Sequence, residues 1–200
     1  GTYYLNGTGA NGVIQIAGSN LKLEGSGVTI IGNSSINTKG IIRTSFWSNI
    51  TIQNIKIINY RMGIHFNGGN DGSNFVNNTI VTTGTGSSRQ RGIMIANAKN
   101  DVFINNNISG NDTSNSGGST GIRLYGSATG VYQNNLSGNY VTGYNSGIVL
   151  DDNVTNNYVY NNTIYNISDQ SSGTAIASKF GSNYTYIINN TINLSRNGIG

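Results

Sequence analysis

The stretch Val76-Asn77-Asn78-Thr79-Ile80 returns four more times along the chain, each time 28 residues further on. The later copies read INNNI at 104–108, YQNNL at 132–136, YNNTI at 160–164 and INNTI at 188–192. A fixed period of this length is typical of proteins that stack one structural repeat on the next. The sequence therefore predicts a solenoid.

The second Asn of each copy forms a predicted column. Its members are Asn78, Asn106, Asn134, Asn162 and Asn190, and the residue two places later is always Ile or Leu. A side-chain amide both donates and accepts hydrogen bonds, so amides stacked at the strand spacing of about 4.8 Å can bond to the copies above and below. We therefore expect an asparagine ladder, with Asn134 buried in the middle of it and Asn145 exposed outside it.

A second motif, Gly-Ile-x-apolar, occurs at 63–66, 92–95, 121–124 and 147–150, with a degenerate copy at 175–178. Alternation of period two marks a strand with one buried face. Strands that stack only on the next repeat make a β-solenoid. The expected fold is all-β: a single-stranded, right-handed, three-sided parallel β-helix of about eight coils, forming one domain over residues 1–200. An antiparallel sandwich, the alternative, does not explain the fixed Asn column.

Two further stretches carry a resemblance to a known family. SNLKLEGSG at 19–27 and SNITIQNI at 48–55, followed by the repeated NNTI, resemble the pectin-lyase-like superfamily, and most of all the β-helix repeats of NosD-type and archaeal surface proteins. The resemblance covers nearly the whole chain and implies a right-handed parallel β-helix. It implies no single activity, because the superfamily includes polysaccharide lyases, hydrolases, epimerases, adhesins and spacers.

Composition points to the outside of a cell. Only 9% of the residues are charged, while Asn alone contributes 35 and Gly 29. There are thirteen Asn-x-Ser/Thr triplets, each a potential glycan acceptor in a secreted protein. We expect an extracellular or cell-surface glycoprotein, and the glycosylation candidates are Asn6, Asn33, Asn111, Asn153, Asn166 and Asn183.

The same composition argues against several other classes. The net charge of +4 comes from basic residues spread singly, so nucleic acid is not an expected partner. No apolar run approaches the ~20 residues of a membrane span, and the chain has no cysteine. No cofactor and no metal site are expected.

The candidate site lies on the outward face of the Gly-Ile strands. Long insertions at 81–91, 109–120, 137–146 and 165–174 predict a wall of stacked loops along one edge of these strands. Beside the wall, the outward column should bring together Arg123, Tyr125, Asp151 and Lys179. That set is typical of a sugar-binding or acid/base cluster. The alternative is an ion pair between Asp151 and Lys179 on a solvated face.

Catalysis is not favoured by the carboxylates available. Glycoside hydrolysis normally needs two carboxylates facing each other across ~5 to 9.5 Å. Asp151 and Asp152 are the only adjacent acidic pair, and in a strand they point to opposite faces. The Asn-Thr-Asp, Gly-His-Gly and Arg-x-Lys motifs of polygalacturonase-like members of the resembled superfamily are also missing.

Two apolar columns precede the ladder, although adjacent strand residues face opposite ways. If the second faces outward, Tyr158 and Tyr186 share an exposed stripe suited to a partner; the alternative is a bend that buries both. The columns are Phe75, Phe103, Val131, Val159 and Ile187, and Val76, Ile104, Tyr132, Tyr160 and Ile188.

Neither end of the sequence reads as a capping segment. We therefore expect a fragment of a longer protein or, with slight preference, copies that stack end to end into a filament or surface layer. The predicted function is a cell-surface structural or interaction module whose partners are copies of itself or surface glycans. The alternative is a polysaccharide-active enzyme or carbohydrate-binding domain, working beside the loop wall of residues 81–174.

Overall fold

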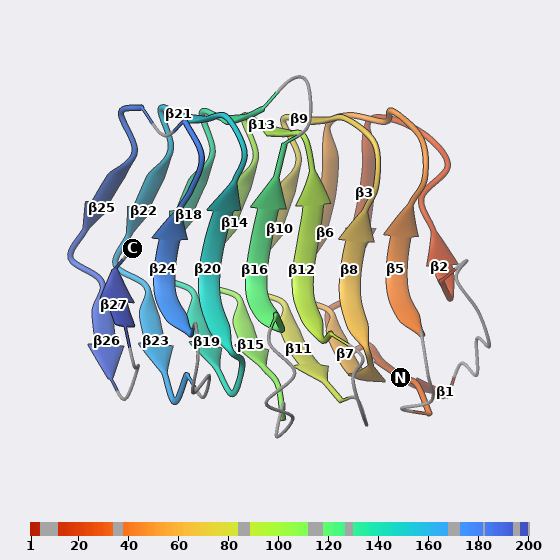
Figure 1. Ribbon diagram of the computed structural model, residues 1–200. Coiled ribbons are helices and arrows are strands. Elements are labelled where there is room, and N and C mark those ends of the chain that lie inside the picture. The colour runs from red at the N-terminus through yellow and green to blue at the C-terminus, as the bar shows by residue number, and fades with distance from the viewer. Residues whose placement is uncertain are drawn as a thin grey trace.

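The computed structural model describes residues 1–4, 12–33, 38–83, 89–111, 118–126, 130–167, 173–181, 183–193 and 197–199. In these ranges the chain forms strands and turns but no helix. All of the strand pairs are parallel, and they build three long sheets around one core (Figure 1). The predicted three-sided parallel β-helix of about eight coils is confirmed.

Each coil visits the three long sheets in turn and adds one strand to each. Sheet A has eight strands: β1 (Thr2–Tyr4), β4 (Thr29–Ile31), β7 (Lys56–Tyr60), β11 (Thr79–Thr82), β15 (Asn107–Ser109), β19 (Tyr140–Thr142), β23 (Thr163–Tyr165) and β26 (Thr191–Asn193). Sheet B, which faces the viewer in Figure 1, also has eight: β2 (Ile14–Gln15), β5 (Lys39–Arg43), β8 (Met62–Phe66), β12 (Arg91–Ala96), β16 (Thr120–Tyr125), β20 (Ser146–Asp151), β24 (Thr174–Ser178) and β27 (Asn197–Ile199).

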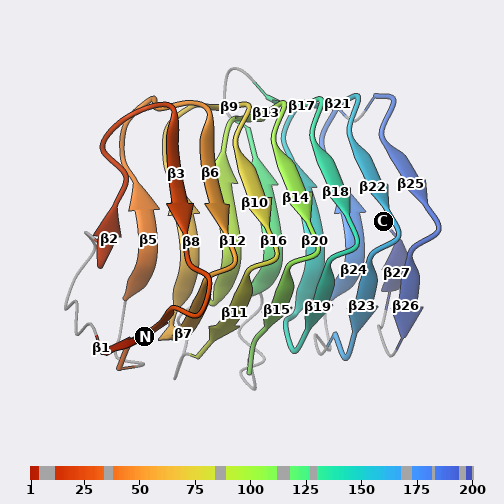
Figure 2. The ribbon, with the colours of Figure 1, turned by 180° about the vertical axis from the view of Figure 1, so that it is seen from behind.

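Sheet C forms the face seen in Figure 2. Its seven strands are β3 (Leu21–Glu24), β6 (Ile50–Gln53), β10 (Asn74–Val76), β14 (Val102–Ile104), β18 (Asn135–Ser137), β22 (Tyr158–Tyr160) and β25 (Tyr186–Ile188). A small sheet D covers the corner between sheets B and C, with strands β9 (Asn70–Asp71), β13 (Ala98–Lys99), β17 (Val131–Tyr132) and β21 (Val154–Thr155).

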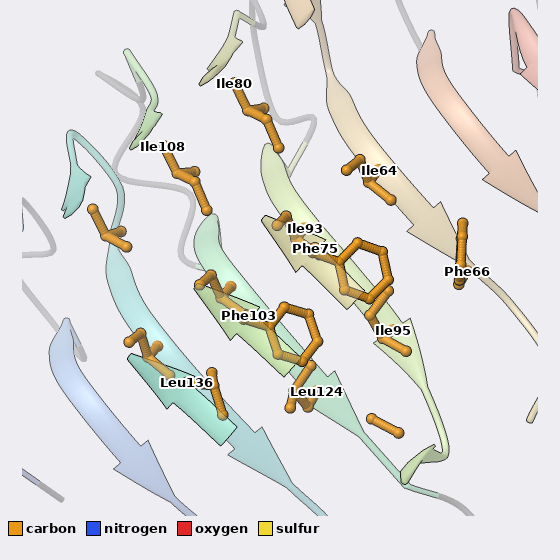
Figure 3. Close-up of a cluster of buried hydrophobic side chains, with 14 of the residues drawn as sticks. Ile64, Phe66, Phe75, Ile80, Ile93, Ile95, Phe103, Ile108, Leu124 and Leu136 are labelled. Atoms are coloured by element: carbon orange, nitrogen blue, oxygen red, sulfur yellow. The ribbon is translucent and has the colours of Figure 1, made fainter. Parts of the chain in front are cut away.

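The core is a stack of like residues. The rings of Phe75 and Phe103, labelled in Figure 3, are stacked with their centroids 4.8 Å apart. The Ile of each Gly-Ile motif, on sheet B, is fully buried in the same core. The Gly of this motif is required by close packing: a Cβ on Gly92 would fall on Cγ2 of Ile108, which reaches across from sheet A. The Gly of the motif is therefore explained by the close packing of sheet A against sheet B.

An asparagine ladder runs through the corner between sheets C and A. The Nδ2 of Asn78 donates to Oδ1 of Asn106 at 3.0 Å, and Asn106 donates in the same way to Asn139 at 2.9 Å. The ladder continues through Asn162 to Asn190 at 2.9 Å for each step. Each Nδ2 also donates to a backbone carbonyl of the preceding coil, so these amides are satisfied without water.

Asn134 does not belong to this ladder, and its predicted place there is wrong. It is fully buried, but it lies in a second ladder five residues earlier in the coil. The backbone N–H of Asp101 donates to Oδ1 of Asn134 at 2.9 Å, and Nδ2 of Asn134 donates to Oδ1 of Asn157 at 2.9 Å. The first rung of this second ladder is Ser73, whose N–H donates to Asp101.

The misassignment has a geometric cause. Along the first ladder, Asn106 and Asn139 are 33 residues apart and Asn139 and Asn162 only 23. Together these two coils are as long as two coils of 28, so in the sequence the 28-residue repeat passes through Asn134 without interruption. Both ladders read as Asn-x-apolar, because Asn134 precedes Leu136 and Asn139 precedes Val141. Leu136 accordingly pairs with Phe103, not with Ile108.

The Asn that directly precedes a residue of the first ladder has a different role from the ladder residue itself. Asn77, Asn105 and Asn161 have φ angles of 52°, 54° and 55°, in the left-handed region that Asn tolerates better than most residues. They turn the corner, and the next residue places its amide in the ladder. Asn145 is also buried, contrary to expectation, because its Oδ1 accepts from the hydroxyl and N–H of Ser119.

Candidate functional site

The outward columns of sheet B have the predicted register. Met94 pairs with His65 on one side and with Arg123 on the other, and Arg123 pairs with Val149. Two residues further along the strands, Tyr125 pairs with Asp151. The structure therefore brings Arg123, Tyr125 and Asp151 together, as the spacing of the Gly-Ile motif indicates.

The ion pair in this column differs from the expected one. Nη2 of Arg123 lies 2.8 Å from Oδ2 of Asp151, whereas the sequence interpretation paired Asp151 with Lys179. Arg123 reaches Asp151 diagonally, because it lies one outward position before Tyr125 on the neighbouring strand. Its guanidinium also lies 5.4 Å from the centroid of the Tyr125 ring. Arg123 is thus held between a carboxylate and an aromatic face.

A shallow groove of about 350 Å³ crosses β12, β16 and β20 on this face and reaches Lys179, which directly follows β24. Four cationic side chains line it together with one carboxylate, which leaves a net charge of +3. The charged lining residues are Arg89, Arg91, Arg123, Lys179 and Asp151, and the uncharged ones are Gly118, Thr120, Ser146 and Val149. Lys179 therefore contributes to the site, while Tyr125 lies outside the lining.

Arg89 and Arg91 line the groove, although the sequence pattern did not single them out as candidate site residues. Arg91 is buried, and its Nη1 donates to the carbonyl of Gln90 at 2.9 Å and to that of Gly118. Arg89 is exposed and lies over Gly118, with its Nε 3.1 Å from the position that a Cβ there would take. The Gly-Ile motif could have pointed to Arg91. The residue directly before the Gly of the motif pairs in register from coil to coil, and in three successive copies it is Arg91, Thr120 and Ser146.

The groove offers cation-rich binding but not paired acid/base chemistry. Asp151 is the one carboxylate in the lining of the groove, and it forms an ion pair with Arg123. Among the residues that the structure describes, no cluster of three or more His, Asp or Glu side chains is arranged to hold a metal ion. The arrangement suits an extended anionic ligand, since a shallow surface with several fixed cations can contact more than one anionic group.

The predicted wall of four loops is corrected at one of its members. Residues 137–146 contain the ladder residue Asn139 and strand β19, so they are part of the coil and not an insertion. Within the other three insertions, residues 84–88, 112–117 and 168–172 lie outside the described residues. The ends that are described, at Arg89 and Gly118, border the groove.

The glycosylation candidates can be placed with one exception. Asn33, Asn111, Asn153, Asn166 and Asn183 are all exposed, and Asn6 lies outside the described residues. Ladder residues such as Asn78 and Asn106 are buried.

The tyrosine stripe on sheet C faces outward. Val76, Ile104, Tyr160 and Ile188 occupy outward positions, so a bend that buries both apolar columns is excluded for them. Tyr158 and Tyr186 are 48% and 44% exposed and stack with centroids 4.9 Å apart. Tyr132 is not part of the stripe, because it belongs to sheet D and pairs with Lys99.

Comparison with known proteins gives no relative: no family model, curated protein or solved structure matches the chain. Within the described ranges, no helix has the length and apolar character needed to cross a membrane.

Proposed function

We propose that this chain is an extracellular β-helix module, related to the pectin-lyase-like proteins, that binds acidic polysaccharides in the sheet B groove without cleaving them. The observation that carries the proposal is the excess of four cationic side chains over one carboxylate in the groove. The relationship is supported by the SNLKLEGSG and SNITIQNI stretches together with the three parallel sheets and their Asn ladder.

The extracellular setting is supported by the surface chemistry. Solubility here rests on amides and hydroxyls, since only 9% of the residues are charged. Five of the six glycan acceptor candidates are described, and all five are exposed. On such a surface the groove is a local concentration of positive charge, which favours uronate or sulfate groups over neutral sugars.

Calorimetric titration with oligogalacturonate and with a neutral oligosaccharide of the same length tests the proposal. At the groove we expect binding of the acidic chain that weakens as salt is raised and that the neutral chain does not displace. Arg123→Gln and Lys179→Gln should each weaken it, while Lys56→Gln, the same change at an exposed strand position on sheet A, should not. An acidic chain that binds Arg123→Gln as tightly as wild type, or that the neutral chain displaces, would contradict the proposal.

Asp151→Asn separates binding from catalysis. If the groove only binds, removing the carboxylate frees Arg123 and strengthens the affinity for a polyanion. If Asp151 is a catalytic acid or base, wild-type protein must release unsaturated or reducing ends from the polymer, and the variant must lose that turnover. Product formation that depends on Asp151 would replace the binding proposal by the enzymatic one.

The tyrosine stripe favours a second function, association with further copies of this chain. Tyr158 and Tyr186 present a stacked, half-exposed aromatic pair on a flat sheet, and such patches are typical of interfaces. Light scattering over a concentration series should show assemblies that the double variant Tyr158→Ser/Tyr186→Ser does not form. A wild-type chain that stays monomeric at high concentration would refute this.

A further inference from the structure

A second hollow lies at the other ends of the sheet B strands, at the corner covered by sheet D. Its volume is about 250 Å³. Three successive coils contribute to it, each through the segment that follows its sheet B strand, and β17 closes it from the next coil. The lining residues are Phe46, Trp47, Ser48, Gly69, Asp71, Asn97, Lys99 and Tyr132, and none of them lines the cationic groove.

Three aromatic side chains give this pocket its apolar surface. Phe46 is 77% exposed, the most exposed large apolar residue described. Its ring lies over Gly69, where a Cβ would be 3.0 Å from Cδ1 of Phe46. Trp47 is partly buried and packs against the core, so its indole is anchored while it also lines the pocket. A solvent-facing aromatic surface supported from behind in this way is suited to stack on a flat ligand.

The polar groups of the pocket already neutralise each other. Nζ of Lys99 lies 3.4 Å from Oδ2 of Asp71 and 5.4 Å from the centroid of the Tyr132 ring. Oδ1 of Asp71 accepts from Nδ2 of Asn100 at 2.9 Å. Lys99 thus occupies the position over the Tyr132 ring where a cationic ligand would bind, and Asp71 has no uncompensated charge to attract one.

We propose that the Trp47 pocket binds a neutral pyranose unit, which stacks on Trp47 and Phe46 and forms hydrogen bonds to Asp71 and Lys99 through its hydroxyl groups. A pyranose has an apolar C–H face and a rim of hydroxyls, so it matches aromatic faces beside a fixed donor and acceptor. The pocket is the right size for one such ring. This site is independent of the cationic groove, and its ligand differs in charge.

Trp47 is the only tryptophan of the chain, so its fluorescence reports on this pocket alone. Titration with neutral gluco-, manno- and galacto-oligosaccharides should give a saturable change in emission with at least one of them. Phe46→Ala should weaken that binding by about tenfold, the value expected for the loss of one stacking contact. Phe180→Ala, which removes another strongly exposed Phe, should leave it unchanged.

The outcomes distinguish this site from the groove. Arg123→Gln should leave the fluorescence titration unchanged, and oligogalacturonate should bind without altering the Trp47 emission. No saturable change with any of the neutral series, or full affinity in Phe46→Ala, would overturn the proposal. A stronger response to choline than to the sugars would overturn it as well, by showing that the pocket is a cation cage.

Discussion

Replacement of Asn139 by Leu tests whether the ladder stabilises the coil stack. Leu has the same number of side-chain heavy atoms and the same branching, but it can neither donate nor accept a hydrogen bond. The backbone N–H of Asn106 donates to Oδ1 of Asn139 at 3.1 Å, and in the variant this buried donor has no acceptor. Three more bonds of the Asn139 amide are lost, to Asn106, to Phe103 and to Asn162.

The expected destabilisation follows from these four bonds. An unsatisfied buried donor costs about 1 to 3 kcal/mol and each of the three other bonds contributes about 1 kcal/mol, which gives roughly 4 to 6 kcal/mol in the free energy of unfolding. For a chain of this length that corresponds to a fall of about 10 to 20 °C in the melting temperature. Differential scanning calorimetry and urea unfolding monitored by circular dichroism measure both quantities.

The matched control is Asn107→Leu, the same change on β15 at an exposed side chain. It should change the stability by less than about 0.5 kcal/mol, as surface substitutions usually do. If the two variants melt at the same temperature, the ladder bonds contribute nothing net and the reasoning is refuted. A loss in Asn139→Leu that is matched by Asn134→Leu would instead show that the two ladders contribute equally.

Two further predictions concern pH and glycans. Burial, and next the nearby charges of Lys39 and Arg61, lower the pKa of His65 to about 4. The imidazole of His65 is protonated near pH 6.5 in the unfolded chain but only near pH 4 in the folded chain. The contribution of neutral His65 to the free energy of unfolding is therefore fully present above pH 6.5 and is lost as the pH falls from 6.5 to about 4. The loss should be about 1 to 3 kcal/mol after allowance for solvent screening, and His65→Gln should remove it in urea titrations at pH 7 and 4.5. For glycans, mass spectrometry of native material should find sugar at exposed acceptors such as Asn166; acceptors carrying no sugar at all would contradict the predicted glycoprotein.

The fold could be predicted from the repeat because the repeated residues are those that form the core and the contacts between sheets. Gly-Ile-x-apolar records both the alternation of a strand and the close approach of Gly92 to Ile108, so the register of sheet B follows from it. The existence of the ladder could be predicted, but not which Asn of this coil belongs to it, since Asn134 and Asn139 both fit the pattern Asn-x-apolar. Only hydrogen bonds between coils distinguish the two, and those depend on where the extra residues of a coil are placed.

Those features of the site that follow from strand register could be predicted from the sequence. Those that depend on side-chain conformation or on the turns could not. Arg123 and Asp151 were brought together correctly, but which cation pairs with Asp151 depends on side-chain reach across a strand. Arg123 reaches it diagonally from the neighbouring strand. The pocket around Trp47 gave no sequence signal, because its residues come from four coils and from turns without a repeat. A lone Trp beside an exposed Phe is visible only once the turns are folded.

The unequal coils also show how freely this chain can change in length. Between the coils of β15 and β19 the spacing along sheet A is 33 residues, while on sheet B the step from β16 to β20 is only 26. Both sheets keep continuous parallel pairing, so the corners absorb the difference. Foreign peptides grafted at the corner between sheets A and B should therefore leave the stack intact. Evolution has the same freedom there, and the chain is a natural scaffold for displaying several variable segments in a row at a pitch of about 4.8 Å.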